Sequence, residues 1–260
     1  MRIGLSAAAF YGRMETEDQA AYLTQFAPEV CEVFLETHSE YAAAFGQTVK
    51  TRLNGIPCVS VHPKGTQFEP DLFGQSPRQR ADARRILCGA LDAGQALGAK
   101  WYVWHGPPAL TGPIVPGRIR QLGERFPLLQ QEAQTRGMEI LWENVSWCAL
   151  RRPEDVYALR DILPGIRFTL DIKQALRAGV DPLDMLRVMG GDIRHVHVLD
   201  WDDTGALCLP GQGTVDFRRL MQELRAQGYD GSVIIEPYTA HAMDADALRR
   251  SLDFLREAAR

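Results

Sequence analysis

The stretch MEILWEN (residues 138–144) is a short apolar run that ends in a carboxylate, Glu143, and three later stretches repeat this pattern. They are IRFTLDI (166–172), IRHVHVLD (193–200) and GSVIIEP (231–237), in which Asp171, His197 and Glu236 stand near the end of the run. An apolar run of this kind predicts a buried parallel strand. In a closed barrel of parallel strands, the C-terminal ends form one mouth, where the active site lies. Four such ends would give a mixed oxygen and nitrogen pocket that suits one divalent cation.

Strand-like runs alternate with helix-like segments along the chain. The eight expected strands are residues 2–5, 30–36, 57–62, 101–105, 138–143, 166–172, 193–199 and 232–236. The expected helical segments are residues 15–27, 39–53, 76–97, 117–136, 153–163, a shorter pair from 174 to 189, 217–227 and 244–259. Several of these segments stop at a glycine, as helices do before a strand. Strict alternation of eight strands with helices predicts the α/β class and one (β/α)8 TIM barrel, a single domain over residues 1–260.

The composition is that of an ordinary globular protein, with 260 residues, 45% hydrophobic and 24% charged. A net charge of −4 and a pI near 5.9 give no general attraction to nucleic acid or to an anionic membrane. No run of 18 apolar residues and no clear signal-cleavage site are present, so we expect neither a membrane span nor a secretory leader. Five cysteines without a CxxC pair predict reduced thiols, with Cys31 and Cys58 buried, and a cytoplasmic location.

Seven of the eight expected strands end in a group that can bind a metal or move a proton. These residues are Glu36, His62, His105, Glu143, Asp171, His197 and Glu236. Charged residues are rare in buried strands, so this many at one level favours chemistry over chance. Glu143 and Glu236 come from strands three apart in the ring, which suits proton removal on one face of a substrate and its return on the other. The structural alternative is that each carboxylate caps a helix or pairs with an arginine.

Four further residues are expected to reach the substrate. His62 and His105 stand where a strand breaks into a loop, and each is interpreted as a ligand of a second metal, a partner of a substrate hydroxyl, or an ordinary hydrogen-bonding histidine. Lys173 and Gln174 directly follow Asp171. We expect Lys173 to supply a cation to a developing oxyanion, with exposure at the surface as its alternative, and Gln174 to form a hydrogen bond.

The alternation within HVHV is interpreted as placing His195 and His197 on opposite sides of the strand, so that only His197 enters the barrel mouth. His195 is then expected to pack against a helix or to lie lower in the barrel. Asp200, three residues after His197, is expected to orient the His197 ring through a hydrogen bond. Its alternative is an ordinary aspartate of a loop turn.

Aromatic residues gather at the same level of the expected barrel. They are Tyr11, Trp104, Trp142, Trp147, Trp201 and Tyr238. Sugar-like ligands place their apolar faces on aromatic rings, which predicts that Trp104, Trp142, Trp201 and Tyr238 bind substrate. Tryptophan is also a good core residue, and this alternative stays open.

The ordered set of motifs resembles the xylose isomerase-like TIM-barrel superfamily, which contains sugar (phosphate) isomerases and epimerases and AP endonuclease family 2. The motifs are SVHP (60–63), WHG (104–106), LWENV (141–145), TLDI (169–172), HVHVLD (195–200), LPGQGTVDF (209–217) and IIEPY (234–238). The resemblance implies that Glu143, Asp171, His197 and Glu236 bind a divalent metal, with Mn²⁺ favoured over Mg²⁺, Co²⁺ or Zn²⁺. It also implies that Glu143 and Glu236 exchange the substrate proton through an enediolate, as in the ketose 3-epimerases of this group.

Two departures from the family pattern bear on function. Gln174 occupies the position of the histidine in the usual Asp-x-x-His, and residues 201–215 contain no histidine. The third site of a three-zinc endonuclease is therefore missing. The sequence favours a metal-dependent isomerase or epimerase of a sugar, a polyol or a related hydroxy-carbonyl compound. A lyase resembling inosose dehydratase is the main alternative, and a DNA-cleaving hydrolase or a barrel that binds without turnover is less favoured. The expected partner is a small sugar-like molecule, with neither nucleic acid nor membrane, and a homo-oligomer is allowed.

Overall fold

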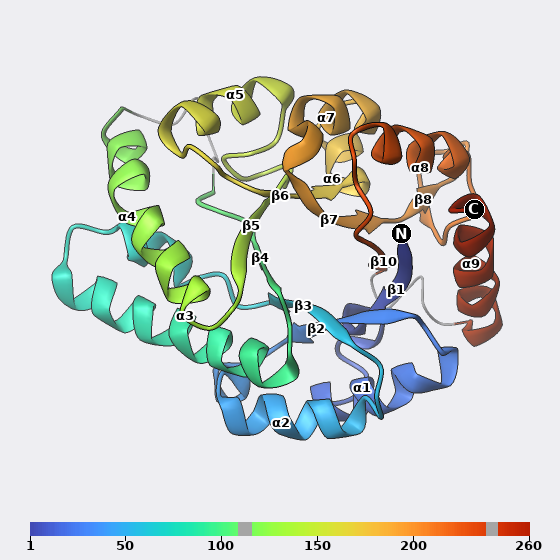
Figure 1. Cartoon of the computed structure of the whole chain (residues 1–260), viewed down its shortest axis with the longest axis horizontal. Helices are drawn as coiled ribbons and strands as arrows, with labels where there is room; N and C mark the ends of the chain where they lie inside the picture. Colours follow the sequence, from blue (N-terminus) through green and yellow to red (C-terminus); the bar gives the residue numbers. More distant parts are fainter. Residues whose placement is uncertain (109–115, 238–243) are drawn as a thin grey trace.

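The strands of the barrel pair in the order of the chain, and the last strand closes on the first (Figure 1). The structure, a computed structural model, describes residues 1–108, 116–237 and 244–260. The parallel barrel strands are β1 (Arg2–Ser6), β2 (Val30–Leu35), β3 (Cys58–Pro63), β4 (Trp101–Trp104), β5 (Glu139–Glu143), β6 (Phe168–Asp171), β7 (Ile193–Val198) and β10 (Ser232–Ile235). β1 pairs with both β2 and β10, which completes the ring. The predicted TIM barrel is therefore confirmed.

Helices surround this ring (Figure 1). They are α1 (Thr16–Leu23), α2 (Ala43–Arg52), α3 (Pro77–Leu97), α4 (Pro116–Gln134), α5 (Pro153–Ile162), α6 (Ile172–Arg177), α7 (Pro182–Met189), α8 (Phe217–Ala226) and α9 (Ala245–Ala258). In α8, Phe217, Leu220, Met221 and Leu224 are buried together, because residues three or four apart share one face of a helix. Among the described residues, no helix is both long and apolar enough to cross a membrane.

The sequence pattern did not indicate two kinds of short element. One is the two-stranded hairpin of β8 (Asp200–Trp201) and β9 (Leu207–Cys208), which follows β7 and lies outside the barrel sheet. The others are the 3-10 helices η1 (Ala7–Phe10), η2 (Thr24–Phe26), η3 (His38–Glu40), η4 (Glu69–Phe73) and η5 (Gly190–Asp192). All five cysteines are free, and Cys31 and Cys58 are buried as expected.

The inside of the barrel changes from apolar to polar along the strands. Val30 and Ile234 belong to a small apolar cluster, and both pair in register with Gly4. A Cβ at Gly4 would come within 2.5 Å of the Ile234 side chain, so this layer has room only for glycine. Two residues further along, Ser6 pairs with Glu32, and this step begins the polar layers that lead to the mouth.

Candidate metal centre

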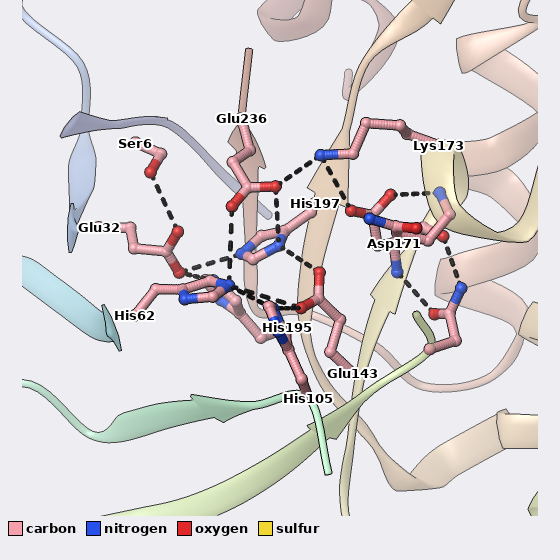
Figure 2. Close-up of polar contacts among 12 residues, drawn as sticks. Ser6, Glu32, His62, His105, Glu143, Asp171, Lys173, His195, His197 and Glu236 are labelled. Carbon is pink, nitrogen blue, oxygen red and sulfur yellow. Dashed lines mark hydrogen bonds and ion pairs between the residues drawn. The ribbon is translucent and has the colours of Figure 1, made fainter. Parts of the chain in front are cut away.

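The four residues predicted as metal ligands converge at the C-terminal mouth of the barrel (Figure 2). Glu143, Asp171, His197 and Glu236 each offer one ligand atom, and these atoms all lie within 4.8 Å of one another. All four residues are buried, and Glu236 is the most exposed at 7%. They come from β5, β6, β7 and the residue after β10. The parallel arrangement of the strands therefore brings them to one point.

The imidazole of His197 lies between two of the carboxylates. Its Nδ1 is 3.1 Å from Glu143 Oε1 and 3.5 Å from Glu236 Oε2. Burial lowers the pKa of His197, but the facing carboxylates outweigh this effect and raise the pKa well above its usual value. Burial likewise raises the pKa of Glu143, but its histidine partners outweigh this and hold the pKa well below its usual range. The site thus favours charged carboxylates that face a positive partner.

Lys173 lies inside the cluster, so the alternative of surface exposure is wrong. Its Nζ is 2.8 Å from Glu236 Oε2 and 3.3 Å from Asp171 Oδ2, and the residue is 2% exposed. Burial raises the pKa of Asp171 to about 7, while the Lys173 charge opposes this rise. The ammonium group therefore offsets part of the repulsion between the carboxylates that β6 and β10 bring together.

This donor set fits one divalent cation. When Glu143, Asp171 and Glu236 are all ionised and His197 is neutral, the positive charge of Lys173 leaves this set with two negative charges. Glu143 Oε2 and Asp171 Oδ2 are buried, and although His105 Nε2 and Lys173 Nζ lie 3.1 and 3.3 Å from them, neither oxygen accepts a hydrogen bond from the described residues. Such oxygens are costly to bury unless a cation compensates them. Three carboxylates with one imidazole suit ions such as Mn²⁺, which accepts oxygen-rich sites, and Zn²⁺, which accepts imidazole.

Two more predicted residues, His62 and His105, face the second oxygen of Glu143. His62 Nε2 and His105 Nε2 are 3.1 Å apart, and they lie 3.5 and 3.1 Å from Glu143 Oε2. These three side chains form another group that could hold a metal ion. The His105 ring also packs edge-on against Trp147, which is 45% exposed. Both histidines therefore border the mouth beside the four-residue cluster.

A second polar layer lies beneath the cluster, and its central residue, Glu32, was not predicted. Glu32 Oε2 is 3.0 Å from His197 Nε2 and 3.1 Å from His195 Nε2. The expected opposite orientation of His195 and His197 is wrong, because residues two apart on a strand point to the same side. His195 lies lower in the barrel than His197, which was one of the two positions expected for it. The signal that could have found Glu32 is a carboxylate in the middle of the apolar run VCEVFL, since buried charges are rare unless paired.

The Asp200 carboxylate forms hydrogen bonds with a loop and not with the His197 ring. Its carboxylate oxygens accept hydrogen bonds from four backbone N–H groups between residues 201 and 215, at 2.9 to 3.0 Å. The two nitrogens of His197 face Glu32, Glu143 and Glu236. The expectation that Asp200 orients His197 is therefore wrong, and the structure shows its alternative, an aspartate of a loop turn.

Trp104 and Trp142 do not reach the barrel mouth. Both are fully buried and pack against Phe126 of α4, between the barrel and its helices. Their strand neighbours His105 and Glu143 point into the barrel, and successive residues on a strand point to opposite sides. The prediction that these two tryptophans bind substrate is corrected, because they are core residues.

Trp201, by contrast, lines an open cleft beside the cluster. The cleft has a volume of about 630 Å³ and is lined by α6 residues, including Lys173, and by residues of the β8–β9 hairpin, including Asp202. Because Lys173 also contacts Asp171, the cleft adjoins the candidate metal centre. Tyr238, the remaining predicted aromatic residue, lies outside the described residues.

Gln174 lies in the first turn of α6, but its side chain contacts the protein itself. Its backbone N–H donates to Asp171 Oδ1 at 2.9 Å, which caps the helix. Gln174 Oε1 accepts hydrogen bonds from the backbone N–H and the hydroxyl of Ser146. Asn144, which was not predicted, forms two hydrogen bonds with the backbone of Asp171, at 2.7 and 2.8 Å. Gln174 and Asn144 thus fix the position of Asp171, and the side-chain amide oxygen of Gln174 is bonded to Ser146.

Comparison with known proteins places this site in a family context. A family model described as xylose isomerase-like TIM barrel matches residues 20–258. Fructoselysine 3-epimerase of Escherichia coli O157:H7 is 22% identical over 195 residues, which cover 72% of this chain and 70% of that protein. Uncharacterized protein Rv0498 of Mycobacterium tuberculosis is 36% identical over 95 residues, 34% of each chain. The match thus spans about a third of this mycobacterial relative.

Solved structures share the whole barrel. D-psicose 3-epimerase from Clostridium cellulolyticum H10 with D-tagatose has a TM-score of 0.78 at 17% identity, and 100% of each chain is covered. 3-keto-D-glucoside 4-epimerase YcjR from E. coli has a TM-score of 0.75 at 21% identity, with 99% of each chain covered. The IOLI protein with a bound zinc atom has a TM-score of 0.74 at 14% identity, over 99% of this chain and 96% of that one. At these identities the likeness establishes the fold.

Proposed function

The chain belongs to the xylose isomerase-like TIM-barrel family, and we propose that it is a divalent-metal-dependent isomerase or epimerase of a sugar, a polyol or a related hydroxy-carbonyl compound. The observation that carries the proposal is the buried cluster of Glu143, Asp171, His197 and Glu236 at the mouth. The names of two similar proteins, fructoselysine 3-epimerase and D-psicose 3-epimerase, support the same class of reaction. A divalent cation on these four residues, with Mn²⁺ favoured, would polarise the oxygens of such a substrate.

Glu143 and Glu236 are proposed as the residues that move the proton. β6 and β7 separate β5 from β10 in the ring, so the two glutamates approach the centre from different directions. In an epimerisation, one carboxylate removes the proton from the carbon beside the carbonyl group, and the other returns a proton to the opposite face. Lys173, 2.8 Å from Glu236 Oε2, keeps that carboxylate oriented toward the centre.

Groups around the cluster are proposed to hold the substrate. His62 and His105 present ring nitrogens at the mouth, where they can bond to substrate hydroxyls. Trp201 offers an apolar surface for the carbons of a sugar-like ligand. The cleft that it lines, about 630 Å³ in volume, falls in the range of small-molecule sites. The five free cysteines agree with a cytoplasmic location, which we also propose.

Metal analysis followed by solvent-deuterium exchange tests the function. We expect a divalent ion in the purified protein and deuterium at the carbon beside the carbonyl group of a ketose or inosose, without loss of water. Glu143→Gln and Glu236→Gln should each lower the exchange rate by about 10²–10⁴-fold, the usual contribution of a general acid or base. Glu139 is a half-buried glutamate at the opposite end of β5. Glu139→Gln is therefore the matched control, and it should exchange the substrate proton at the wild-type rate.

The same experiment separates the alternatives. Exchange together with loss of water would indicate the lyase related to inosose dehydratase. If the protein binds a metal but incorporates deuterium into none of the ketoses and inososes tested, turnover of this substrate class would be contradicted. A barrel that binds a ligand without turnover would then remain. Full activity of Glu143→Gln would contradict the mechanism with two glutamates.

A further inference from the structure

The second polar layer converges on Glu32, which is completely buried (Figure 2). Ser6 Oγ donates a hydrogen bond to Glu32 Oε1 at 3.1 Å, and Ser60 Oγ donates one to Oε2 at 2.8 Å. The Nε2 atoms of His195 and His197 lie 3.1 and 3.0 Å from the same Oε2. Groups from β1, β3 and β7 therefore hold this carboxylate in one orientation beneath the candidate metal centre.

Glu32 faces the nitrogen of His197 that must carry the proton when a cation binds the other nitrogen. A neutral imidazole has one N–H donor and one lone pair, and an ionised carboxylate can only accept. Both ring nitrogens face carboxylates, but a cation bound on the Nδ1 side leaves Nε2 as the nitrogen that carries the N–H, and Nε2 faces Glu32. The Nδ1 lone pair then points toward Glu143 and Glu236, at 3.1 and 3.5 Å. A lone pair that faces carboxylates is repelled by them unless a cation lies between.

We propose that Glu32 is a positioning residue, which accepts the Nε2–H of His197 and so presents Nδ1 to the divalent cation. This inference rests on the proposed function, since it requires the metal. Carboxylates that hold the second nitrogen of a metal-bound histidine fix its tautomer and raise its basicity, and their loss commonly costs about 10–100-fold in metal affinity. Glu32, His195 and His197 are also close enough to form a metal site of their own. Their hydrogen bonds to one another and to the serines already satisfy Glu32, so we assign this layer a supporting role.

Glu32→Gln tests the proposal, because glutamine keeps the shape of the side chain but replaces one oxygen with an NH2 donor. When this donor faces Nε2, the His197 ring must carry its proton on Nδ1, where it excludes the cation. We expect the Kd for Zn²⁺, measured by competition with a chelator, to rise about 10–100-fold. The ¹⁵N resonances of His197 in the zinc-loaded protein should report Nε2–H in the wild type and a changed pattern in the variant.

Glu69→Gln is the matched control. Glu69 is also a buried carboxylate, but neither of its oxygens has a hydrogen-bond partner among the described residues, and it belongs to none of the groups that could hold a metal. This variant should keep the wild-type affinity for Zn²⁺ and the wild-type His197 resonances. An equal loss of affinity in Glu69→Gln and Glu32→Gln would show a general effect of replacing a buried carboxyl group and would overturn the proposal.

The remaining outcomes separate this inference from the proposed function. Unchanged Zn²⁺ affinity and unchanged His197 resonances in Glu32→Gln would overturn the role of Glu32 and leave the metal centre intact. A wild-type protein that binds no divalent cation would overturn both. If Glu32→Gln fails to fold, the Ser6→Ala/Ser60→Ala double variant replaces it, because it removes the two serine hydrogen bonds that orient Glu32 and leaves His197 unchanged. We then expect about 10-fold weaker Zn²⁺ binding, the lower end of the same range, and unchanged binding would refute the proposal.

Discussion

Replacing Lys173 with methionine should destabilise the metal-free protein, and a bound divalent cation should reduce this loss. The Lys173 ammonium group is buried, 2.8 Å from Glu236 Oε2 and 3.3 Å from Asp171 Oδ2. At an effective dielectric constant of about 20, these distances correspond to attractions of about 6 and about 5 kcal/mol, before the desolvation of the charges is subtracted. Measured losses on removing one partner of a buried ion pair are about 3–5 kcal/mol. We expect a loss of this size in EDTA.

The thermal midpoint is the measurable quantity. A change of 1 kcal/mol shifts the Tm of a chain of this size by about 2 °C, so Lys173→Met should melt about 6–10 °C below wild type in EDTA. Saturating Mn²⁺ should raise the Tm of the variant more than that of the wild type, because the cation supplies the positive charge that the variant lacks. Lys100→Met, at an exposed lysine just before β4, should stay within about 1 °C of wild type.

Two results would refute this reasoning about charge. One is a Tm for Lys173→Met in EDTA equal to that of the wild type, which would mean that Asp171 and Glu236 do not need the ammonium group. The other is an equal loss with and without Mn²⁺, which would mean that the cation and Lys173 do not act on the same carboxylates.

Three further outcomes are expected. Calorimetric titration with Zn²⁺ should fill one tight site and at most one more, formed by His62, His105 and Glu143. The protein should not cleave a DNA duplex that contains an abasic site. A third tight zinc site together with cleavage would revive the endonuclease alternative. In steady-state kinetics, Trp201→Ala should raise KM more than it lowers kcat, because the Trp201 ring lines the cleft beside the reacting centre. A larger effect on kcat than on KM would instead place the Trp201 ring at the reacting centre. Asp200→Asn should lower the Tm by several degrees, since each hydrogen bond to a charged acceptor contributes about 1.5–3 kcal/mol; an unchanged melting curve would show that the loop after β7 does not depend on this carboxylate.

Local order along the chain was enough to predict the barrel and the residues at its mouth. Short apolar runs separated by helical segments have few ways to bury their surfaces, and a closed parallel sheet covered by helices is the one that strict alternation favours. A residue at the end of such a strand lies at the mouth whatever its neighbours are. For this reason Glu143, Asp171, His197 and Glu236 could be recognised before their contacts were known.

The direction and partners of each side chain depended on the closed barrel. The side of a strand follows from alternation, and counting from Glu143 and His105 would have placed Trp142 and Trp104 in the outer core. Partners across the barrel do not follow from any local pattern. Glu32 and His197 are 165 residues apart in the sequence, yet their side chains meet at 3.0 Å. That contact requires β2 and β7, which β1 and β10 separate in the closed ring, to point these side chains into the barrel at the same level, and only the packing of the whole sheet sets this register.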